Sequence, residues 1–226
     1  GICGYNIYAT IDYCYNTGTV SGDGNVGGIC GYNTNNGKII SCFSIGTISC
    51  DSGYAGGVCG YSSYTSSVKY CYFDKTVYSG DAVGYNGGTP TSVLGKSSDK
   101  FANGEVAYLL NGDQSNIIWG QTINSDKLPV IGGAQVYATT GCMTFSNDSA
   151  KTEAKDHDFS KGNGICNDCG AYEPAESVDD VYQIDSVTDL YWFAEQVNSG
   201  NTSYNAVLTA DITVNSGVID SNGNLA

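Results

Sequence analysis

The sequence predicts a mainly β protein that forms a parallel β-solenoid, with coils of about 28 residues and short capping helices. Two observations support this fold class. A short motif of glycine, cysteine and tyrosine recurs along the first third of the chain at nearly constant spacing. Only 14% of the residues are charged, against about 25% in average domains, and Gly, Tyr, Asn and Thr are abundant, which is typical of strands joined by turns.

The repeated unit contains two blocks, each centred on a cysteine. The first block is Gly-Ile-Cys-Gly-Tyr or Gly-Val-Cys-Gly-Tyr, at residues 1–5, 28–32 and 57–61. The second is a cysteine followed by an aromatic residue, at 13–15, 41–43 and 70–72. A unit this short cannot bury its own apolar face, so the copies are expected to stack as parallel coils about 4.8 Å apart. The predicted solenoid covers residues 1–90 in three copies, with ladders such as Tyr5/Tyr32/Tyr61 and Tyr15/Phe43/Tyr72.

Stacking of the copies would arrange six cysteines in two columns. These columns are Cys3/Cys30/Cys59 and Cys14/Cys42/Cys71, and Cys50 falls outside both. Cα atoms on neighbouring rungs would lie about 4.8 Å apart, which a disulfide tolerates. Parallel side chains are poorly oriented for bridging, however, and this favours the alternative of small, buried hydrophobic thiols.

Residues 91–138 are predicted to cap the solenoid, because its open end would otherwise expose unpaired strand edges. The stretch 97–112 predicts a short helix, with Gly112 at the position that follows a helix end. Its apolar positions are Val106, Ala107, Leu109 and Leu110. The stretch 117–137 predicts strands and turns.

Residues 139–176 are predicted to form a Cys/His knuckle and linker. They contain the single histidine, His157, and the C-x-x-C motif of Cys166 and Cys169, with Cys142 upstream. Zinc takes four nitrogen or sulfur ligands in a tetrahedron, and C-x-x-C places two thiolates on one turn, so these four residues predict a structural zinc site. The alternative is a disulfide between Cys166 and either Cys169 or Cys142, with His157 exposed, which oxidising surroundings would favour. A site closed by four protein ligands would not be catalytic.

Residues 177–226 are predicted to hold the N-terminal cap and first strand of a following solenoid. Ser186 and Asp189 have the spacing of a capping box, before a helix from about residue 187 to 198 that ends at Gly200. The apolar stripe of this helix is Leu190, Phe193, Ala194 and Val197. A strand is predicted at 205–214 and a turn at 220–224.

Composition excludes several classes of partner and activity. The net charge is −14, with nine Lys and Arg, so the chain lacks the basic surface that nucleic acids or anionic membranes would need. We find no apolar run of about 18 residues and expect no membrane insertion. Hydrolase, zinc-protease and phosphate-loop motifs are also missing, and the single histidine is assigned to the knuckle. We therefore expect no enzymatic activity and no catalytic residue.

The repeated blocks, together with Thr-Gly-Thr-Val at 17–20, resemble the GLUG repeat over residues 1 to about 75. That repeat occurs in bacterial cell-surface proteins, adhesins and some surface peptidases. The resemblance implies a β-solenoid stalk and an extracellular location at the bacterial cell surface, and it names no catalytic residue.

We expect a structural or adhesive module that assembles head to tail into a filament. Its partners would be copies of itself or neighbouring repeats, with the strand at 205–214 covering the open edge at Gly1 of a neighbour. Excision from a longer tandem array would explain the same order of elements. One alternative function is a glycan-binding surface module, with a host or microbial glycan as partner. Another is a non-catalytic accessory region of a surface peptidase or glycan-active enzyme.

Overall fold

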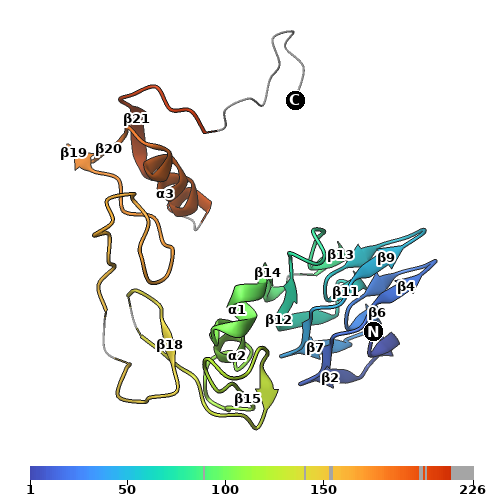
Figure 1. Cartoon of the computed structure of the whole chain (residues 1–226). Helices are drawn as coiled ribbons and strands as arrows, with labels where there is room; N and C mark the ends of the chain where they lie inside the picture. The colour runs from blue at the N-terminus through green and yellow to red at the C-terminus, as the bar shows by residue number, and fades with distance from the viewer. Residues whose placement is uncertain (89, 140, 153–154, 199–200, 202, 215–226) are drawn as a thin grey trace. The chain divides into compact units, whose positions relative to one another are not determined.

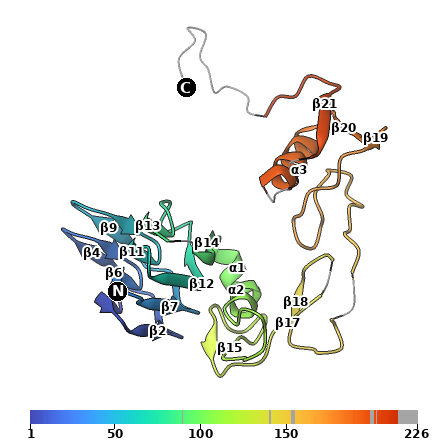
Figure 2. The same cartoon turned by 180° about the vertical axis from the view of Figure 1, so that it is seen from behind.

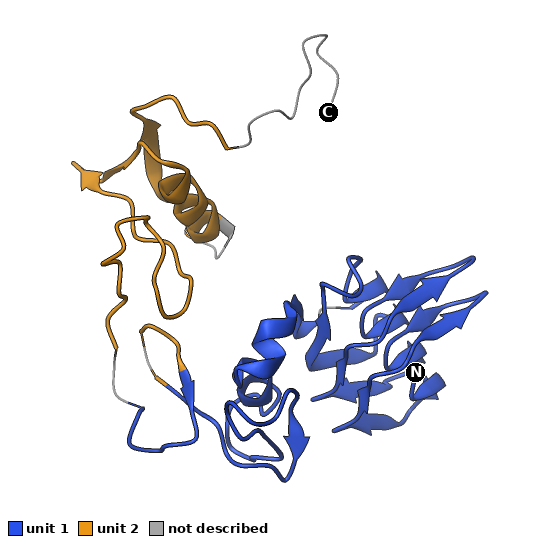
Figure 3. Cartoon of the chain, viewed as in Figure 1, with its two compact units in different colours: residues 1–138, 145–152 blue, residues 139–144, 153–226 orange. Residues whose placement is uncertain are grey.

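The computed structural model describes residues 1–214 apart from residues 89, 140, 153–154, 199–200 and 202. The chain is mainly β and contains several parallel sheets. It divides into two compact units (Figure 3). Unit 1 consists of Gly1–Ala138 with Phe145–Thr152, and unit 2 of Thr139–Thr144 with Glu153–Ala226.

One parallel sheet of unit 1 aligns the first cysteine block of each copy. Its strands are β1 (Cys3–Ile7), β6 (Cys30–Thr34), β11 (Cys59–Ser62) and β13 (Val83–Asn86), in this order. Cys3 pairs with Cys30, and Cys30 pairs with Cys59. Val83 takes the same place on the fourth strand. The predicted parallel stacking in register is confirmed. It extends to a fourth strand, β13, in which Val83 stands in place of the cysteine.

The second cysteine block lies in another parallel sheet. Its strands are β2 (Thr10–Asp12), β7 (Lys38–Ile40), β12 (Ser67–Asp74), β8 (Phe43–Ser44) and β3 (Tyr15–Asn16), with β14 (Thr91–Lys96) also paired to β12. Two short parallel pairs join β4 (Val20–Gly22) to β9 (Ile48–Cys50) and β5 (Val26–Gly27) to β10 (Ala55–Gly56). Strands β4 and β9 lie side by side in both views (Figure 1, Figure 2).

The cysteine columns line the interior of unit 1. Their buried members pack with Ile29, Ile39, Val58 and Val68. All ten cysteines of the chain are free thiols. A hydrogen bond with Cys71 and burial raise the pKa of the Cys42 thiol far above its ordinary value, so this thiol is protonated at neutral pH. These observations support small buried thiols rather than disulfides.

The two predicted aromatic ladders are confirmed, and they face in different directions. Tyr5, Tyr32, Tyr61 and Tyr85 stack at the surface, with successive ring centroids 4.9, 4.4 and 4.6 Å apart. In the other ladder the Tyr15 ring stacks on Phe43 at 5.2 Å, and Phe43 pairs in register with Tyr72. Phe43 and Tyr72 are buried in a cluster with four residues of the cap: Phe101, Val106, Leu110 and Trp119.

The cap contains two short helices where the sequence predicted one over 97–112. Helix α1 (Ser98–Ala102) and helix α2 (Glu105–Leu109) are separated at Gly104, whose φ is +95°. A residue in this left-handed conformation cannot continue a right-handed helix, which explains the break. The predicted apolar residues Val106, Ala107 and Leu110 are buried. Short antiparallel pairs follow, β15 (Trp119–Gly120) with β16 (Val130–Ile131) and β17 (Tyr137–Ala138) with β18 (Phe145–Ser146).

Unit 2 contains a small sheet and one helix. The sheet order is β19 (Ser177–Val178), β20 (Val181–Ile184) and β21 (Asn205–Leu208), with β20 and β21 parallel. Helix α3 (Val187–Asn198) begins at the predicted capping box. There the Asp189 backbone N–H donates to Ser186 Oγ, and the Ser186 N–H donates to the Asp189 carboxylate, both at 3.1 Å.

Two predictions for unit 2 need correction. The buried residue of α3 is Trp192, with Leu190 and Phe193 partly buried, whereas Ala194 and Val197 are exposed. A tryptophan buries far more apolar area than alanine, so its contacts decide which face packs. Strand β21 ends at Leu208 rather than at residue 214. Gly200 and the turn at 220–224 lie outside the described residues. None of the described helices has the length and apolar character that crossing a bilayer requires.

Candidate metal centre

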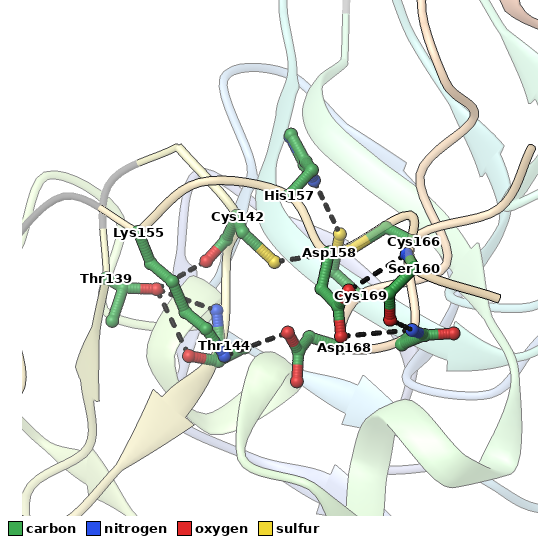
Figure 4. A network of polar contacts seen from close by, with 11 residues as sticks. Thr139, Cys142, Thr144, Lys155, His157, Asp158, Ser160, Cys166, Asp168 and Cys169 are labelled. Carbon is green, nitrogen blue, oxygen red and sulfur yellow. Dashed lines mark hydrogen bonds and ion pairs between the residues drawn. The ribbon is translucent and has the colours of Figure 1, made fainter. Parts of the chain in front are cut away.

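Unit 2 brings together the four residues that the sequence predicted as ligands. One donor atom from each of Cys142, His157, Cys166 and Cys169 lies within 4.8 Å of the others (Figure 4). The Sγ atoms of Cys142 and Cys166 are 3.5 Å apart, and Cys169 Sγ lies 3.3 Å from His157 Nδ1. Cys142 and Cys166 are buried, while His157 is exposed. Their spacing is compatible with a metal ion held by three sulfurs and one imidazole.

The C-x-x-C segment forms a tight turn between two short extended stretches. Ile165 and Tyr172 form an antiparallel bridge on either side of it. The Cys166 N–H donates to the Ala171 carbonyl at 2.8 Å, and the Gly170 N–H donates to the Cys166 carbonyl at 3.0 Å. Gly170 has a φ of +77°, a conformation that glycine adopts without steric penalty. The turn therefore brings Cys166 and Cys169 into the same cluster of four possible donors.

Cys142 is held beside the histidine segment by the backbone. Gly141 forms a parallel bridge with Lys155, and the Cys142 N–H donates to the Lys155 carbonyl at 2.7 Å. Thr139 Oγ1 donates a further hydrogen bond to the Cys142 carbonyl. Since Lys155 precedes His157 by two residues, these contacts bring both ligands to the same cluster.

Polar contacts then join the histidine segment to the C-x-x-C turn. Asn167, inside the motif, donates its backbone N–H to the Asp158 carbonyl at 2.8 Å and its amide to Asp158 Oδ2 at 3.0 Å. Lys155 Nζ lies 2.9 Å from Asp168 Oδ2 (Figure 4). Each contact involves a residue next to a ligand or two positions from one, so together they fix the spacing between the two halves of the cluster.

The electrostatic surroundings differ between two of the thiols. Burial and the neighbouring sulfurs of Cys169 and Cys166 raise the pKa of Cys142 to about 12. Burial also opposes ionisation of Cys166, but hydrogen bonds from the backbone of Cys169 and Asp168 and from His157 outweigh it and lower its pKa to about 6. Cys166 is therefore the sulfur that ionises most readily. Further thiolates in the cluster would repel one another, and a bound divalent cation would offset this repulsion.

The structure assembles all four predicted ligands and leaves their cysteines as free thiols. It also shows what the sequence reasoning missed. Lys155, Asp158, Asn167 and Asp168 support the cluster, and their closeness to the ligands in the sequence was the available signal. Four protein donors complete a tetrahedron without an open position for substrate, which suits a structural ion rather than a catalytic one.

Comparison with known proteins identifies one segment of unit 1. Residues 22–49, which run from the end of β4 to β9, match the GLUG motif. The match supports the GLUG character of the repeat. Neither the curated proteins nor the solved structures gave a match to the chain.

Proposed function

We propose that the chain is a non-enzymatic structural module of a bacterial surface protein, and that its repeated copies are the successive coils of a β-solenoid, each of which contributes strands to the parallel sheets. The register supports the solenoid, because equivalent residues of each copy pair along several separate parallel sheets. The GLUG motif supports the extracellular surface location, in which such a module would act as a spacer or present an adhesive face.

The observation that carries this proposal is the edge of the first sheet at β1. The cap lies along the side of the stack, where Trp119 contacts Tyr15 of the first coil and Phe43 of the second, and it leaves this edge free. β1 is an edge strand of its sheet in the described part of the chain, and Ile2, Tyr5 and Ile7 beside or within it are exposed. An uncovered strand edge with apolar side chains is a template for another strand.

A second copy of the chain offers a strand of the required kind. β21 is the edge strand of the sheet in unit 2, and it is already in parallel pairing with β20. Its Val207 and Leu208 are 45% and 67% exposed. We infer that β21 of one copy adds to the β1 edge of the next. Because such contacts are head to tail and do not close, they generate a filament.

Electron microscopy and analytical ultracentrifugation over a range of concentrations test this assembly. We expect concentration-dependent filaments for the natural sequence and a monomer for Tyr5→Glu, because the free face of the Tyr5 ring lies at the uncovered edge. Tyr64→Glu makes the same change at a tyrosine that is 78% exposed on the third copy, and it should assemble normally. A monomer at every concentration would overturn the proposal.

We further infer that the cluster in unit 2 holds a structural zinc ion. Three thiolates and an imidazole are donors that zinc prefers, and the alternative disulfide would remove two of them. Elemental analysis of the purified protein should find one zinc ion per chain. Cys142→Ser and His157→Ala should lose it, whereas Cys50→Ser, which removes a thiol in unit 1, should keep it. The assignment is wrong if the purified protein of natural sequence contains no bound zinc.

A further inference from the structure

Four equivalent positions on successive strands of unit 1 form a column in which tyrosine and serine alternate. The column is Tyr13, Ser41, Tyr70 and Ser92, as the pairing of β2, β7, β12 and β14 requires. All four residues have φ between +50° and +53°, so each coil makes the same left-handed corner at this point. The column therefore holds two aromatic side chains with a serine between them.

A cavity of about 160 Å³ lies at this gap. Tyr13, Ser41 and Tyr70 line it on the side of the coils. The loop after α2 lines the other side with Asp113, Ser115 and Asn116, which are exposed and so form its mouth. The cavity thus has aromatic walls and a polar rim.

The spacing of the coils sets the size of what fits between the tyrosines. Tyr13 and Tyr70 are two rungs apart, or about 10 Å along the stack. Where a ring is present on every rung, as in the Tyr5 ladder, centroids are 4.4 to 4.9 Å apart. The small side chain at Ser41 therefore leaves a gap one ring wide between the two tyrosines, and a ring in this gap would lie at stacking distance from both. The cavity is well below the roughly 300 Å³ of the smallest pockets that bind drug-sized ligands, so it suits a single small ring.

The walls of the cavity are held in place before any ligand binds. The side chain of Asn111, which begins the loop after α2, accepts from the N–H groups of Ile118 and Trp119 at 3.0 and 2.9 Å. Its amide donates to the carbonyls of Ala107 and Trp119. A Cβ added to Gly112 would lie within 3.0 Å of the Tyr70 ring, so that ring rests against the loop backbone. A preformed site of this kind avoids the entropy of ordering its own loop.

We propose that this cavity binds one neutral sugar ring of a glycan, between Tyr13 and Tyr70. The apolar faces of a pyranose stack on aromatic rings, and its hydroxyls can bond the carboxylate, hydroxyl and amide groups of the rim. The Asp113 carboxylate, whose Oδ1 accepts from the Ser115 N–H at 3.0 Å, accepts from hydroxyls and repels anions. With a net charge of −14 on the chain, acidic sugars and nucleotides are disfavoured.

The chain supplies a matched pair of variants for testing this site. Ser41→Tyr fills the gap with the side chain that Tyr13 and Tyr70 already carry at the same backbone conformation. Ser92→Tyr makes the same substitution at an equivalent corner that does not line the cavity. The probes are glucose, galactose, mannose and N-acetylglucosamine. Their binding is measured by saturation-transfer NMR, and then on an array of oligosaccharides that end in these sugars.

We expect at least one of these sugars to receive saturation from the tyrosine ring protons. Ser41→Tyr should weaken its binding by about tenfold or more, and Ser92→Tyr should leave it unchanged. Asp113→Asn, in an exposed loop, should weaken binding without affecting the fold, and it decides the matter if Ser41→Tyr unfolds. The proposal is overturned if none of the probes binds, or if the folded Ser41→Tyr or Asp113→Asn protein binds as the natural sequence does. Binding is measured on monomer or filament alike, so this outcome is independent of the assembly proposal.

Discussion

At the scale of single residues, the amide of Asn33 connects three coils inside unit 1. Its Oδ1 accepts from Asn6 Nδ2 at 2.8 Å on the preceding coil, and its Nδ2 donates to Ser62 Oγ at 3.4 Å on the following one. The same Nδ2 also donates to the Gly37 carbonyl at 3.2 Å. Asn33 is fully buried, so water cannot replace these bonds if the side chain is lost.

We therefore expect Asn33→Ala to lower the free energy of unfolding by about 2 kcal/mol, since it leaves buried donors and acceptors without partners. Asn86→Ala is the matched control, because Asn86 lies at the same position on β13, and its side chain is exposed and bonds Gly88 within its own turn. Urea denaturation followed by circular dichroism measures both. Equal losses for the two variants would show that burial of the amide does not set its contribution.

At the scale of elements, sequence reasoning succeeded wherever the same residues recur on neighbouring strands. The register of β1, β6 and β11 follows directly from the repeated cysteine block, because identical strands stack identically. The helix break at Gly104 could not be predicted in this way, since glycine is tolerated within helices as well as at their ends. The buried face of α3 was predicted wrongly because the prediction used only the spacing of apolar residues and did not weigh the large side chain of Trp192.

The glycine column Gly4, Gly31, Gly60 allows a prediction about the close approach of coils. A Cβ at Gly31 would lie 2.7 Å from the Asn25 carbonyl oxygen and 2.8 Å from that of Gly4, both in rigid backbone. At Gly4 a Cβ would meet nothing within 4 Å. Gly31→Ala should therefore destabilise unit 1 by about 2 kcal/mol, and Gly4→Ala should leave its stability nearly unchanged.

Thermal denaturation of the two variants as monomers at low concentration measures this difference. Similar melting temperatures would mean that the coils are looser than the distances at Gly31 imply. If the β1 edge is covered in a filament, Gly4 becomes equivalent to Gly31. Gly4→Ala should then prevent assembly at high concentration while the monomer stays stable.

At the scale of the whole molecule, the two units hold themselves together by different means. Unit 1 has two buried clusters, formed by the coil interior and by the cap. The core of unit 2 consists of Ala175, Ile184 and Trp192 with partly buried neighbours. The clustering of Cys142, His157, Cys166 and Cys169 could be predicted because a single histidine and a single C-x-x-C are rare, specific signals. The cavity at Ser41 could not, because its rim comes from a loop about 70 residues later in the chain.

We predict that removing zinc from the proposed site affects unit 2, whose core is small, and leaves unit 1 folded. Metal binding to such a cluster is coupled to folding, so a zinc chelator should expose the backbone of residues 155–172. Tyr172 packs against the core of α3, which should transmit part of this loss to unit 2 as a whole. Hydrogen exchange with mass spectrometry should then show faster exchange in unit 2 and unchanged protection of β6 and β11. Cys142→Ser should reproduce this pattern without chelator. Loss of protection in β6 and β11 would instead show that the metal centre and the coils unfold as one cooperative unit.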